Sequence, residues 1–392
     1  SFIIKYWSVE KTGKYQFFNN ENVPIYIFMS VIIAIFVGLT VSAEEIFKDK
    51  KILKREKYLN LSRGSYLFSK TFILFVISAY QSLVYVLIGN GIIEIRGFYL
   101  EYWLVLFSVW FSANLMGLII SELFDSSTTI YIIIPFLVIP QLVLTGVLVP
   151  FNKLNPRISS PVSIPFYGEI FQARWAYEAL SVKQFRDNDY NRIFYPYDKI
   201  VAEADYIKQY WCKTINNKVD EILRYKSIPE KQNLCIDNLT LIKNELSTNH
   251  FWLKKYPIDF NINNLTIENI ENNILDSVTQ YIEKLKIYYI EISNNIIDQK
   301  DLLINQLIAQ DPNYLFNLKS KYHNEKLEAF VLGDRLNDQA VIYKNRIYCY
   351  YKPIFNTPEN KFLKAIYYSP TKPFFHFQID TFWFNVVVIW II

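Results

Sequence analysis

The sequence predicts a mainly α-helical membrane protein with several spanning helices and a large, mostly helical region outside the membrane. Three observations predict this class. Four long stretches lack Asp, Glu, Lys and Arg, a basic helix-favouring segment separates the first two, and apolar residues recur at helical spacing in the polar half that follows. The chain is 52% hydrophobic with a mean hydropathy of +0.10, an average over one nearly uncharged part and one rich in Asn, Lys, Asp, Glu and Tyr.

The four uncharged stretches are each long enough to cross a bilayer. They cover residues 23–43, 71–93, 102–121 and 126–152. At a rise of about 1.5 Å per residue, about 20 residues cross about 30 Å of hydrocarbon. Core helices of soluble proteins rarely lack a polar face four times in succession, so we interpret all four stretches as membrane spans. The apolar segment from about Ile379 is a candidate fifth span.

The basic segment lies between the first two spans. Residues 43–70 (AEEIFKDKKILKREKYLNLSRGSYLFSK) carry eight Lys or Arg residues against four Asp or Glu. Cytoplasmic loops of membrane proteins carry such an excess of positive charge, so we place this segment in the cytoplasm. Alternation of the spans then makes residues 150–376 extracytoplasmic, in a multi-pass protein of the plasma or inner membrane. The net charge of +4 is too small to indicate a nucleic-acid partner.

Small and polar residues within the spans leave two interpretations open. Gly38 and Gly117 allow helices to approach closely. Gln81, Asn114 and Gln141 either hold helices together or line a translocation path. Packing is the commoner role, because no charged residue in these stretches marks an ion or proton route.

Prolines mark the end of the membrane half. Pro135 and Pro140 interrupt the backbone hydrogen bonds of the last full span, which gives either a static kink or a helix that bends during gating. Residues 159–180 are semi-apolar and aromatic, which is typical of an interfacial or re-entrant element. Arg174 and Glu178 are four residues apart, so on a helix they pair as a structural lock or as part of a gate.

The polar region beyond residue 186 has a mostly helical pattern. Two sets of apolar residues fall at helical spacing, and the second set is long enough for a helical hairpin or stalk. Residues 346–351 (RIYCYY) are the best strand candidate. The two sets are Ala204, Ile207, Trp211, Ile215, Val219 and Ile222, then Ile267, Ile270, Ile274, Val278, Tyr281, Leu285, Tyr289, Ile292 and Ile296.

The cysteines and the known chemical motifs limit the chemistry of the chain. Cys212 and Cys235 are the pair to expect in an oxidising space on proximity alone, with three unpaired cysteines, Cys349 included, as an equally open alternative. No Cys or His spacing indicates a metal, and GxxxxGK[ST], GxSxG and HExxH motifs are absent, so we predict no catalytic residue, metal or cofactor in this sequence. Ser1 follows no initiator Met and both ends interrupt apolar runs, so we expect a fragment of a longer protein.

Three strings carry a family resemblance. They are KREKY at 54–58, VLVPF at 147–151 followed by Leu154-Asn155-Pro156, and RWAYEAL at 174–180. The segments also follow a particular order: span, basic cytoplasmic helix, three spans, proline-broken aromatic segment, outer region and last span. Order and strings together resemble the membrane domain of type-2 ABC exporters (ABC-2 permeases), in particular the G subfamily of half-transporters of the white and pleiotropic-drug-resistance type. The resemblance covers residues 1–185 and the terminal span.

The resemblance implies a division of the chain. The part between residues 185 and 376 departs from the family, whose outer loop is much shorter. The implied segments are 1–22 (end of span one and outer loop), 23–149 (spans two to five, with a coupling helix at 44–60), 150–185 (re-entrant segment), 186–376 (extracytoplasmic domain) and 377–392 (truncated start of the last span).

The resemblance also implies the permease part of an ATP-driven exporter. A cytosolic ATPase domain, expected before span one in the same polypeptide, would bind ATP and Mg²⁺, and a second membrane domain would complete a homo- or heterodimer in the bilayer. The coupling helix would contact the ATPase domain; the alternative is that its lysines only hold the topology and touch anionic lipid. The contact residues implied are Glu44, Glu45, Lys54, Arg55, Glu56 and Tyr58.

In such a dimer a translocation path runs between the second and fifth spans. The candidates for facing it are Phe28, Phe36, Gln141, Leu144 and Thr145. Two other functions stay open. An ABC ATPase could move the outer helical region as a mechanical or sensory device, or the chain could be a polytopic anchor for an outer binding module without any ATPase.

Overall fold

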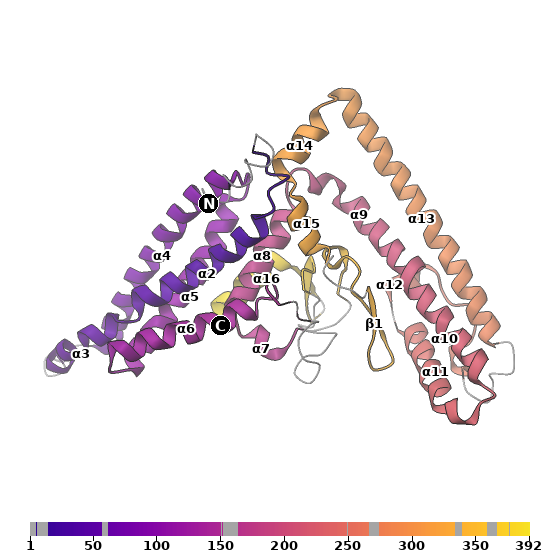
Figure 1. Ribbon diagram of the computed structural model, residues 1–392, viewed down its shortest axis with the longest axis horizontal. Coiled ribbons are helices and arrows are strands. Elements are labelled where there is room, and N and C mark those ends of the chain that lie inside the picture. Colours follow the sequence, from indigo (N-terminus) through magenta and orange to yellow (C-terminus); the bar gives the residue numbers. More distant parts are fainter. Residues whose placement is uncertain are drawn as a thin grey trace.

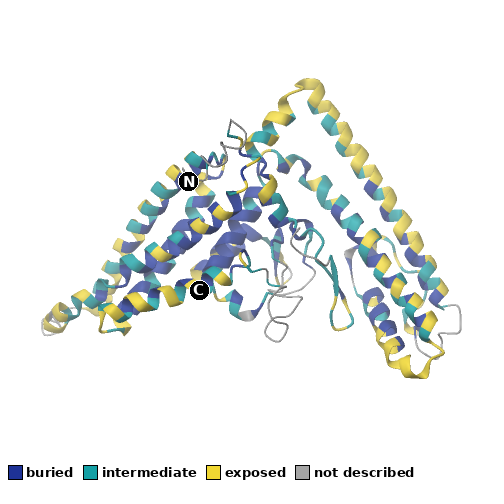
Figure 2. Cartoon of the chain, in the orientation of Figure 1, coloured by how far each residue is buried: buried dark blue, intermediate teal, exposed yellow. Residues whose placement is uncertain are grey.

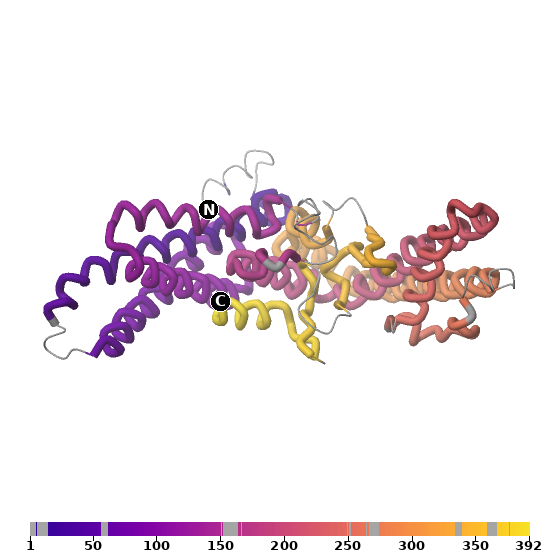
Figure 3. The backbone as a smooth tube through the Cα atoms, turned by 90° about the horizontal axis from the view of Figure 1, so that it is seen from below, coloured from indigo at the N-terminus to yellow at the C-terminus, as the bar shows by residue number. Residues whose placement is uncertain are grey.

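The computed structural model describes residues 5, 15–56, 62–149, 151, 164–248, 250–265, 274–333, 339–358, 367–375 and 377–392. Two legs meet as an inverted V (Figure 1). One leg is a bundle of apolar helices, here called the bundle, and the other is a long helical arm, here called the arm. Seen from below, they extend in opposite directions from the place where they meet (Figure 3). Helices dominate both legs, as predicted.

Three helices of the bundle are long and apolar enough to cross a membrane. They are α2 (Val23–Ser42), α4 (Arg63–Ile93) and α5 (Tyr99–Leu123), and they contain the first three predicted spans almost entirely. α4 begins before its apolar stretch because Ser62 Oγ accepts a hydrogen bond from Ser65 N–H at 3.3 Å, which caps the helix.

The fourth predicted span, 126–152, is wrong in its length. α6 (Ser127–Val143) has only 17 residues. The chain turns at Gly146, whose φ of 79° suits glycine and strains other residues. The last apolar helix, α16 (Thr381–Ile391), has 11 residues. Both helices are shorter than the roughly 20 residues of a full span.

Close contact between α2 and α5 forms the centre of the bundle. A Cβ at Gly38 would lie 2.7 Å from Trp110 O, and a Cβ at Gly117 would lie 2.9 Å from Leu39 O. Both distances are shorter than van der Waals contact, so only glycine lets the two backbones approach this closely. The packing interpretation of these two glycines is therefore confirmed.

Polar side chains inside the bundle bond from helix to helix. Asn114 Nδ2 of α5 donates to Ser78 Oγ of α4 at 2.8 Å. Tyr26 of α2 donates its hydroxyl to Asn90 Oδ1 of α4 at 2.9 Å. Such bonds satisfy polar groups that lipid cannot. For Asn114 the structure therefore supports packing rather than a path.

A short turn of helix and a buried helix follow α6. They are α7 (Phe166–Glu169) and α8 (Gln172–Arg186). Every residue of α8 is buried except Lys183 and Arg186, because α8 packs against α2, α5 and α16. The dark-blue centre of the bundle in Figure 2 includes this helix. Residues 150 and 152–163 of the predicted re-entrant segment lie outside the described residues.

The arm consists of one helical run that leaves the bundle and one that returns to it (Figure 1). The outgoing run changes to π-helix for five residues before it resumes as α-helix. α13 packs along the outgoing run, and α11 covers its far end. The elements are α9 (Asn191–Tyr206), η3 (Ile207–Trp211), α10 (Cys212–Tyr225), η4 (Pro229–Lys231), α11 (Gln232–Ser247), α12 (Phe251–Lys255), η5 (Ile262–Asn264) and α13 (Ile274–Gln310).

The arm has its own hydrophobic core, separate from that of the bundle. All six residues of the first predicted apolar set are buried in the arm, and most described members of the second set join them. Ile267 and Ile270 lie outside the described residues. Glu245 is buried in this core, where it accepts hydrogen bonds from Trp211 Nε1 at 2.7 Å and from Ile347 N–H at 2.9 Å. Helical periodicity therefore predicted the buried faces of the outgoing run and of α13, but not that of α11.

The returning chain packs back onto the bundle. Leu327, Phe330 and Val331 belong to the core of the bundle, although they lie within the predicted outer domain. The predicted strand at 346–351 is confirmed as one half of a hairpin. A second hairpin follows further along the described chain, and both hairpins are antiparallel. The elements are α14 (Tyr314–Tyr322), α15 (Glu325–Val331), β1 (Ala340–Ile342), β2 (Ile347–Cys349), η7 (Pro353–Phe355), β3 (Thr371–Phe374) and β4 (Phe377–Asp380).

The packing of α2 on α5 gives a first prediction. We expect Gly38→Val to lower the free energy of unfolding by about 1–3 kcal/mol, because the added atoms overlap the backbone of Trp110. Thermal unfolding of the detergent-solubilised chain measures this. Gly64→Ala is the control, since a Cβ there meets Ser62 Oγ at an ordinary 3.7 Å. Equal stability of the two variants would contradict the close approach.

Candidate functional site: a basic surface helix and a buried ionic cluster

The basic segment forms a helix at the end of the bundle remote from the arm (Figure 1). This helix, α3 (Glu45–Glu56), follows α2 directly. Glu45 in its first turn and Lys54 and Arg55 in its last turn match the sign of the helix dipole. The helix predicted at 44–60 therefore exists, although residues 57–61, including Tyr58, lie outside the described residues.

α5 caps the beginning of α3. The hydroxyl of Ser121 accepts hydrogen bonds from the backbone N–H groups of Ile46 at 3.0 Å and Phe47 at 2.8 Å. Such N–H groups have no partner within their own helix, so a buried helix start needs one from elsewhere. Ile46 packs with Leu74 of α4 and Leu118 of α5 in a small hydrophobic cluster. α3 is thereby held to two spans.

Ion pairs fasten α3 on its remaining sides. Lys70 of α4 contacts Glu45 at 2.7 Å and Asp49 at 3.0 Å. Lys50 contacts Asp125, in the turn between α5 and α6, at 2.7 Å. Glu44, predicted as a contact to an ATPase domain, lies 2.8 Å from Lys48 one turn along. Of the predicted contact residues, Glu44 and Glu45 are therefore engaged within this chain.

The outward face of α3 is cationic. Among the α3 residues whose burial is described, the exposed charged ones are all lysine or arginine, and they include the predicted residues Lys54 and Arg55. Ile52 is exposed beside them. Nothing is described of the Glu56 side chain. The exposed charged residues are Lys48, Lys51, Lys54 and Arg55.

The second candidate site is a cluster of buried charges around Glu178 of α8. Its Oε1 accepts from Lys372 Nζ of β3 at 2.6 Å and from the Tyr368 N–H at 2.9 Å. Its Oε2 accepts from Arg174 Nη1 at 3.2 Å and from Asn385 Nδ2 of α16 at 3.1 Å. One carboxylate thus connects α8, β3 and α16. The predicted pair of Arg174 and Glu178 is present.

The cluster is electrically balanced. Arg174 also pairs with Glu169 of α7, and its guanidinium lies 3.7 Å from the centre of the Trp175 ring. Glu169 and Glu178 together offset Arg174 and Lys372. Arg174, Glu178 and Lys372 are at most 2% exposed. Buried charges are tolerated only when they are paired and hydrogen-bonded, so the four groups depend on one another.

A second ionic link lies at the C-terminal end of α8. Arg186 Nη2 contacts Asp380 Oδ2 at 2.5 Å, and Arg186 Nη1 donates to Pro370 O at 3.1 Å. Asp380 also caps α16, because its Oδ1 accepts from Phe382 N–H at 2.9 Å. α8 and α16 are therefore joined at both the cluster and this link.

Sequence reasoning missed five of these groups: Glu169, Arg186, Lys372, Asp380 and Asn385. Lys372 lies 194 residues from Glu178 along the chain, and Asn385 lies 207 residues away. One signal was available: Asn385 is the single polar residue within the apolar run 382–392. A polar residue in such a run calls for a polar partner inside the protein.

The predicted path residues have different surroundings. Phe28 is buried edge-on against Tyr177 of α8, with ring centres 6.2 Å apart. Thr145 is buried, and its carbonyl accepts from the Tyr367 hydroxyl at 2.5 Å. Gln141 is also buried, whereas Phe36 is 47% exposed on α2. Leu144, beside Thr145, is half-buried. Their role in a path stays a prediction.

Cys212 and Cys235 are both free thiols in the structure, which favours the unpaired alternative over a disulfide between them. Cys212 belongs to the hydrophobic core of the arm, and Cys235 is buried outside that core. Burial raises the pKa of the Cys212 thiol to about 12. The thiol therefore stays protonated and unreactive at neutral pH.

The apolar helices and the charged helix at one end of them define an integral, polytopic membrane protein. Residues 2–185 match the family model described as ABC-2 type transporter. This match supports an ABC-2 permease domain in that part of the chain, the permease part of an ABC transporter. Neither the curated proteins nor the solved structures contain a match to the chain.

The buried cluster gives a second prediction. We expect Lys372→Met to lower the free energy of unfolding by about 3–5 kcal/mol, because it leaves a buried negative charge uncompensated. The double variant Glu178→Gln/Lys372→Met should recover part of this loss, since both charges are gone. Chemical denaturation in detergent measures all three proteins. Lys344→Met, at an exposed lysine of the β1–β2 turn, is the control. A loss no larger than the control's would exclude the cluster as a stabilising element.

Proposed function

We propose that this chain is the membrane-spanning permease part of an ATP-driven ABC exporter of the G-subfamily type, and that α3 is its coupling helix. The observation that carries the proposal is the construction of α3. Its inner face is fastened to α4, α5 and the α5–α6 turn, while its outer face presents Lys51, Lys54 and Arg55. A force applied to that outer face reaches two spans without an intervening flexible link.

The chemistry of α3 suggests what binds it. Because Glu44 and Glu45 are paired within the chain, the charges left for a partner are positive. We therefore expect an acidic surface on the ATPase domain opposite α3, with ATP and Mg²⁺ bound by that domain. Anionic lipid is the alternative partner for the same lysines. Exposed Ile52 favours a protein surface, because an apolar side chain among cations suits a protein contact.

The arrangement of the two legs supports the proposed sidedness. α3 and the arm lie at opposite ends of the bundle (Figure 1). With α3 in the cytoplasm, residues 150–376 lie on the extracytoplasmic side. The membrane would be the plasma membrane or a bacterial-type inner membrane. A second membrane domain, from a second copy or a related chain, completes the transporter, and Phe28, Phe36, Gln141, Leu144 and Thr145 are candidates for its path.

A second candidate function is mechanical. The chain that returns from the arm packs into the bundle, since Leu327, Phe330 and Val331 of α15 lie in the core of the bundle. Movement of the spans would therefore reach α13, whose 37 residues extend about 55 Å at about 1.5 Å per residue. In this alternative the ATPase moves the arm instead of a substrate.

Charge reversal on α3 tests the coupling proposal. In the transporter assembled with its ATPase domain, we expect Arg55→Glu to reduce the ATP hydrolysis rate about ten-fold or more, because it repels an acidic partner surface. Thermal stability should stay unchanged, since Arg55 is exposed. Lys226→Glu, at an exposed lysine on the arm, makes the same change in net charge away from α3. An ATPase rate equal to that of Lys226→Glu would rule out α3 as the coupling element.

Shortening the arm separates the two candidate functions. Lys208 Nζ donates to Ser293 Oγ at 3.1 Å, so the two runs of the arm are adjacent there. Residues 209–292 can therefore be replaced by a short Gly/Ser loop that leaves α15 and its contacts in place. We expect transport of a fluorescent amphiphile into inside-out vesicles to persist. ATP hydrolysis without transport, in the full-length protein as well as in the shortened one, would favour the mechanical function.

A further inference from the structure

The arm and the bundle meet at a small group of residues, here called the elbow: 17–20, 185–191 and 323–328. Asn324 ties the elbow together. Its Nδ2 donates to Phe17 O at 2.8 Å and to Asn20 O at 2.9 Å, and its Oδ1 accepts from Leu327 N–H at 2.8 Å. Asn324 thus caps α15 and holds the loop before α2 in one set of bonds. Its neighbour His323 lies at the end of α14, where the arm returns.

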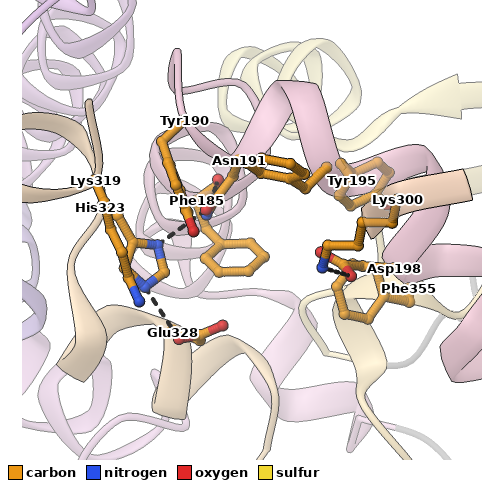
Figure 4. A pocket seen from close by; sticks show the side chains of 11 residues that line it. Phe185, Tyr190, Asn191, Tyr195, Asp198, Lys300, Lys319, His323, Glu328 and Phe355 are labelled. Atoms are coloured by element: carbon orange, nitrogen blue, oxygen red, sulfur yellow. Dashed lines mark hydrogen bonds and ion pairs between the residues drawn. The ribbon is translucent and has the colours of Figure 1, made fainter. Parts of the chain in front are cut away.

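His323 is the most enclosed ionisable group of the elbow, at 3% exposed. It lines a cavity of about 140 Å³ with aromatic rings from α8, α9 and η7 (Figure 4). Its Nδ1 lies 2.9 Å from Asn191 Oδ1, and its Nε2 lies 3.1 Å from Glu328 Oε2. The ring therefore bridges the start of α9 and α15.

The orientation of the Asn191 amide decides whether its oxygen or its nitrogen faces the His323 ring. Asn191 Nδ2 donates to Phe185 O at 2.7 Å. The reverse orientation would place the amide oxygen against that carbonyl, two acceptors facing each other. Asn191 therefore offers its oxygen to His323, and Glu328 offers a carboxylate oxygen. Both are acceptors, so both ring nitrogens must donate, and only the imidazolium form of histidine has two N–H groups.

We propose that His323 is a proton-dependent positioning residue: in its imidazolium form it fixes the arm to the bundle, and loss of the proton releases one side of the bridge. Neutral His323 would keep one hydrogen bond and set a nitrogen lone pair against either Asn191 or Glu328. Deprotonation therefore breaks the hydrogen bond from the end of α14 either to α9 or to α15. The attachment of the arm thereby depends on the pH at the outer side of the membrane.

Some charged and aromatic groups around the His323 ring favour its imidazolium form, and others oppose it. Glu328 of α15 favours the cation, as do the rings of Phe18, Tyr190 and Phe185, whose centres lie 5.7, 5.3 and 6.4 Å from that of His323. Lys319 of α14 opposes the cation, because its ammonium carries a like charge and lines the same cavity as His323. This ammonium lies 5.1 Å from the centre of the Phe18 ring. Across the cavity, Lys300 of α13 is paired with Asp198 of α9 at 2.5 Å, so these two charges offset each other.

The sign of the pH effect follows from the bridge. The bridge needs both N–H groups of the imidazolium, so it is complete at low pH and loses one hydrogen bond as the pH rises. Histidine is the side chain that titrates between about pH 5 and about pH 8. This inference does not depend on what drives the permease.

Hydrogen exchange of the full chain in lipid nanodiscs tests the proposal. The probes are the backbone amides of Phe18 and Glu325, which donate to Ser320 O and Phe18 O across the elbow, and of Leu327, which donates to the Asn324 cap. After correction for the intrinsic exchange rate, we expect their protection to fall about ten-fold between about pH 6 and about pH 8. Amides in the centre of α5 should keep their protection.

Three variants decide whether His323 and Glu328 cause the effect. Glu328→Gln should abolish the pH dependence while keeping the elbow folded, because an amide can accept from Nε2–H or donate to bare Nε2. His323→Gln should abolish it as well. Glu325→Gln, an exposed acid in the first turn of the same helix, should retain the wild-type response. Unchanged protection in the wild type, or an undiminished response in Glu328→Gln, overturns the proposal.

Discussion

The buried carboxylate of Glu178 is the group on which the centre of this molecule depends. Its four donors come from α8, from the segment that enters β3, and from α16, so the last apolar helix is held in place by a charge on an internal helix. Removing a carboxylate from water is costly, and the cost is offset only when every acceptor position is filled. α8, β3 and α16 therefore depend on one another: without Lys372 of β3 the cluster keeps an excess negative charge, and without Asn385 of α16 the Glu178 carboxylate loses a hydrogen bond.

The ends of the bundle are fastened by other means than its middle, which bears on how movement passes through it. At one end, α3 is held by the Ser121 hydroxyl and by ion pairs of Lys50 and Lys70. In the middle, α2 and α5 meet backbone to backbone at Gly38 and Gly117. At the other end, Arg186 joins α8 to Asp380 at the start of α16, and His323 joins the arm to α9 and α15. The first and last of these depend on charge, whereas the middle depends on shape.

Much of the bundle was predictable because its signals are local. Uncharged stretches of sufficient length predicted α2, α4 and α5, and the excess of lysine with a helical pattern predicted α3. Arg174 and Glu178 could be paired because a helix places residues four apart side by side. The end of α6 was not predictable from hydropathy, since apolar residues continue past Val143 and the backbone turn at Gly146 stops the helix. The sequence left the pairing of Cys212 with Cys235 open, because closeness in sequence does not decide whether two side chains are close in space.

The sequence by itself determined which helices are apolar enough to span a membrane, which segment is basic, and which faces of the arm are buried, because length, charge and periodicity are properties of neighbouring residues. Only the tertiary structure decided the partners of the charged groups. It turned Glu44 and Glu45 toward the chain itself, brought Lys372 and Asn385 to Glu178 from about two hundred positions away, and placed His323 between two acceptors. The physical reason is that a buried charge is satisfied by whichever donors and acceptors the fold brings within about 3 Å. Those partners cannot be predicted from the residues that neighbour the charge in sequence.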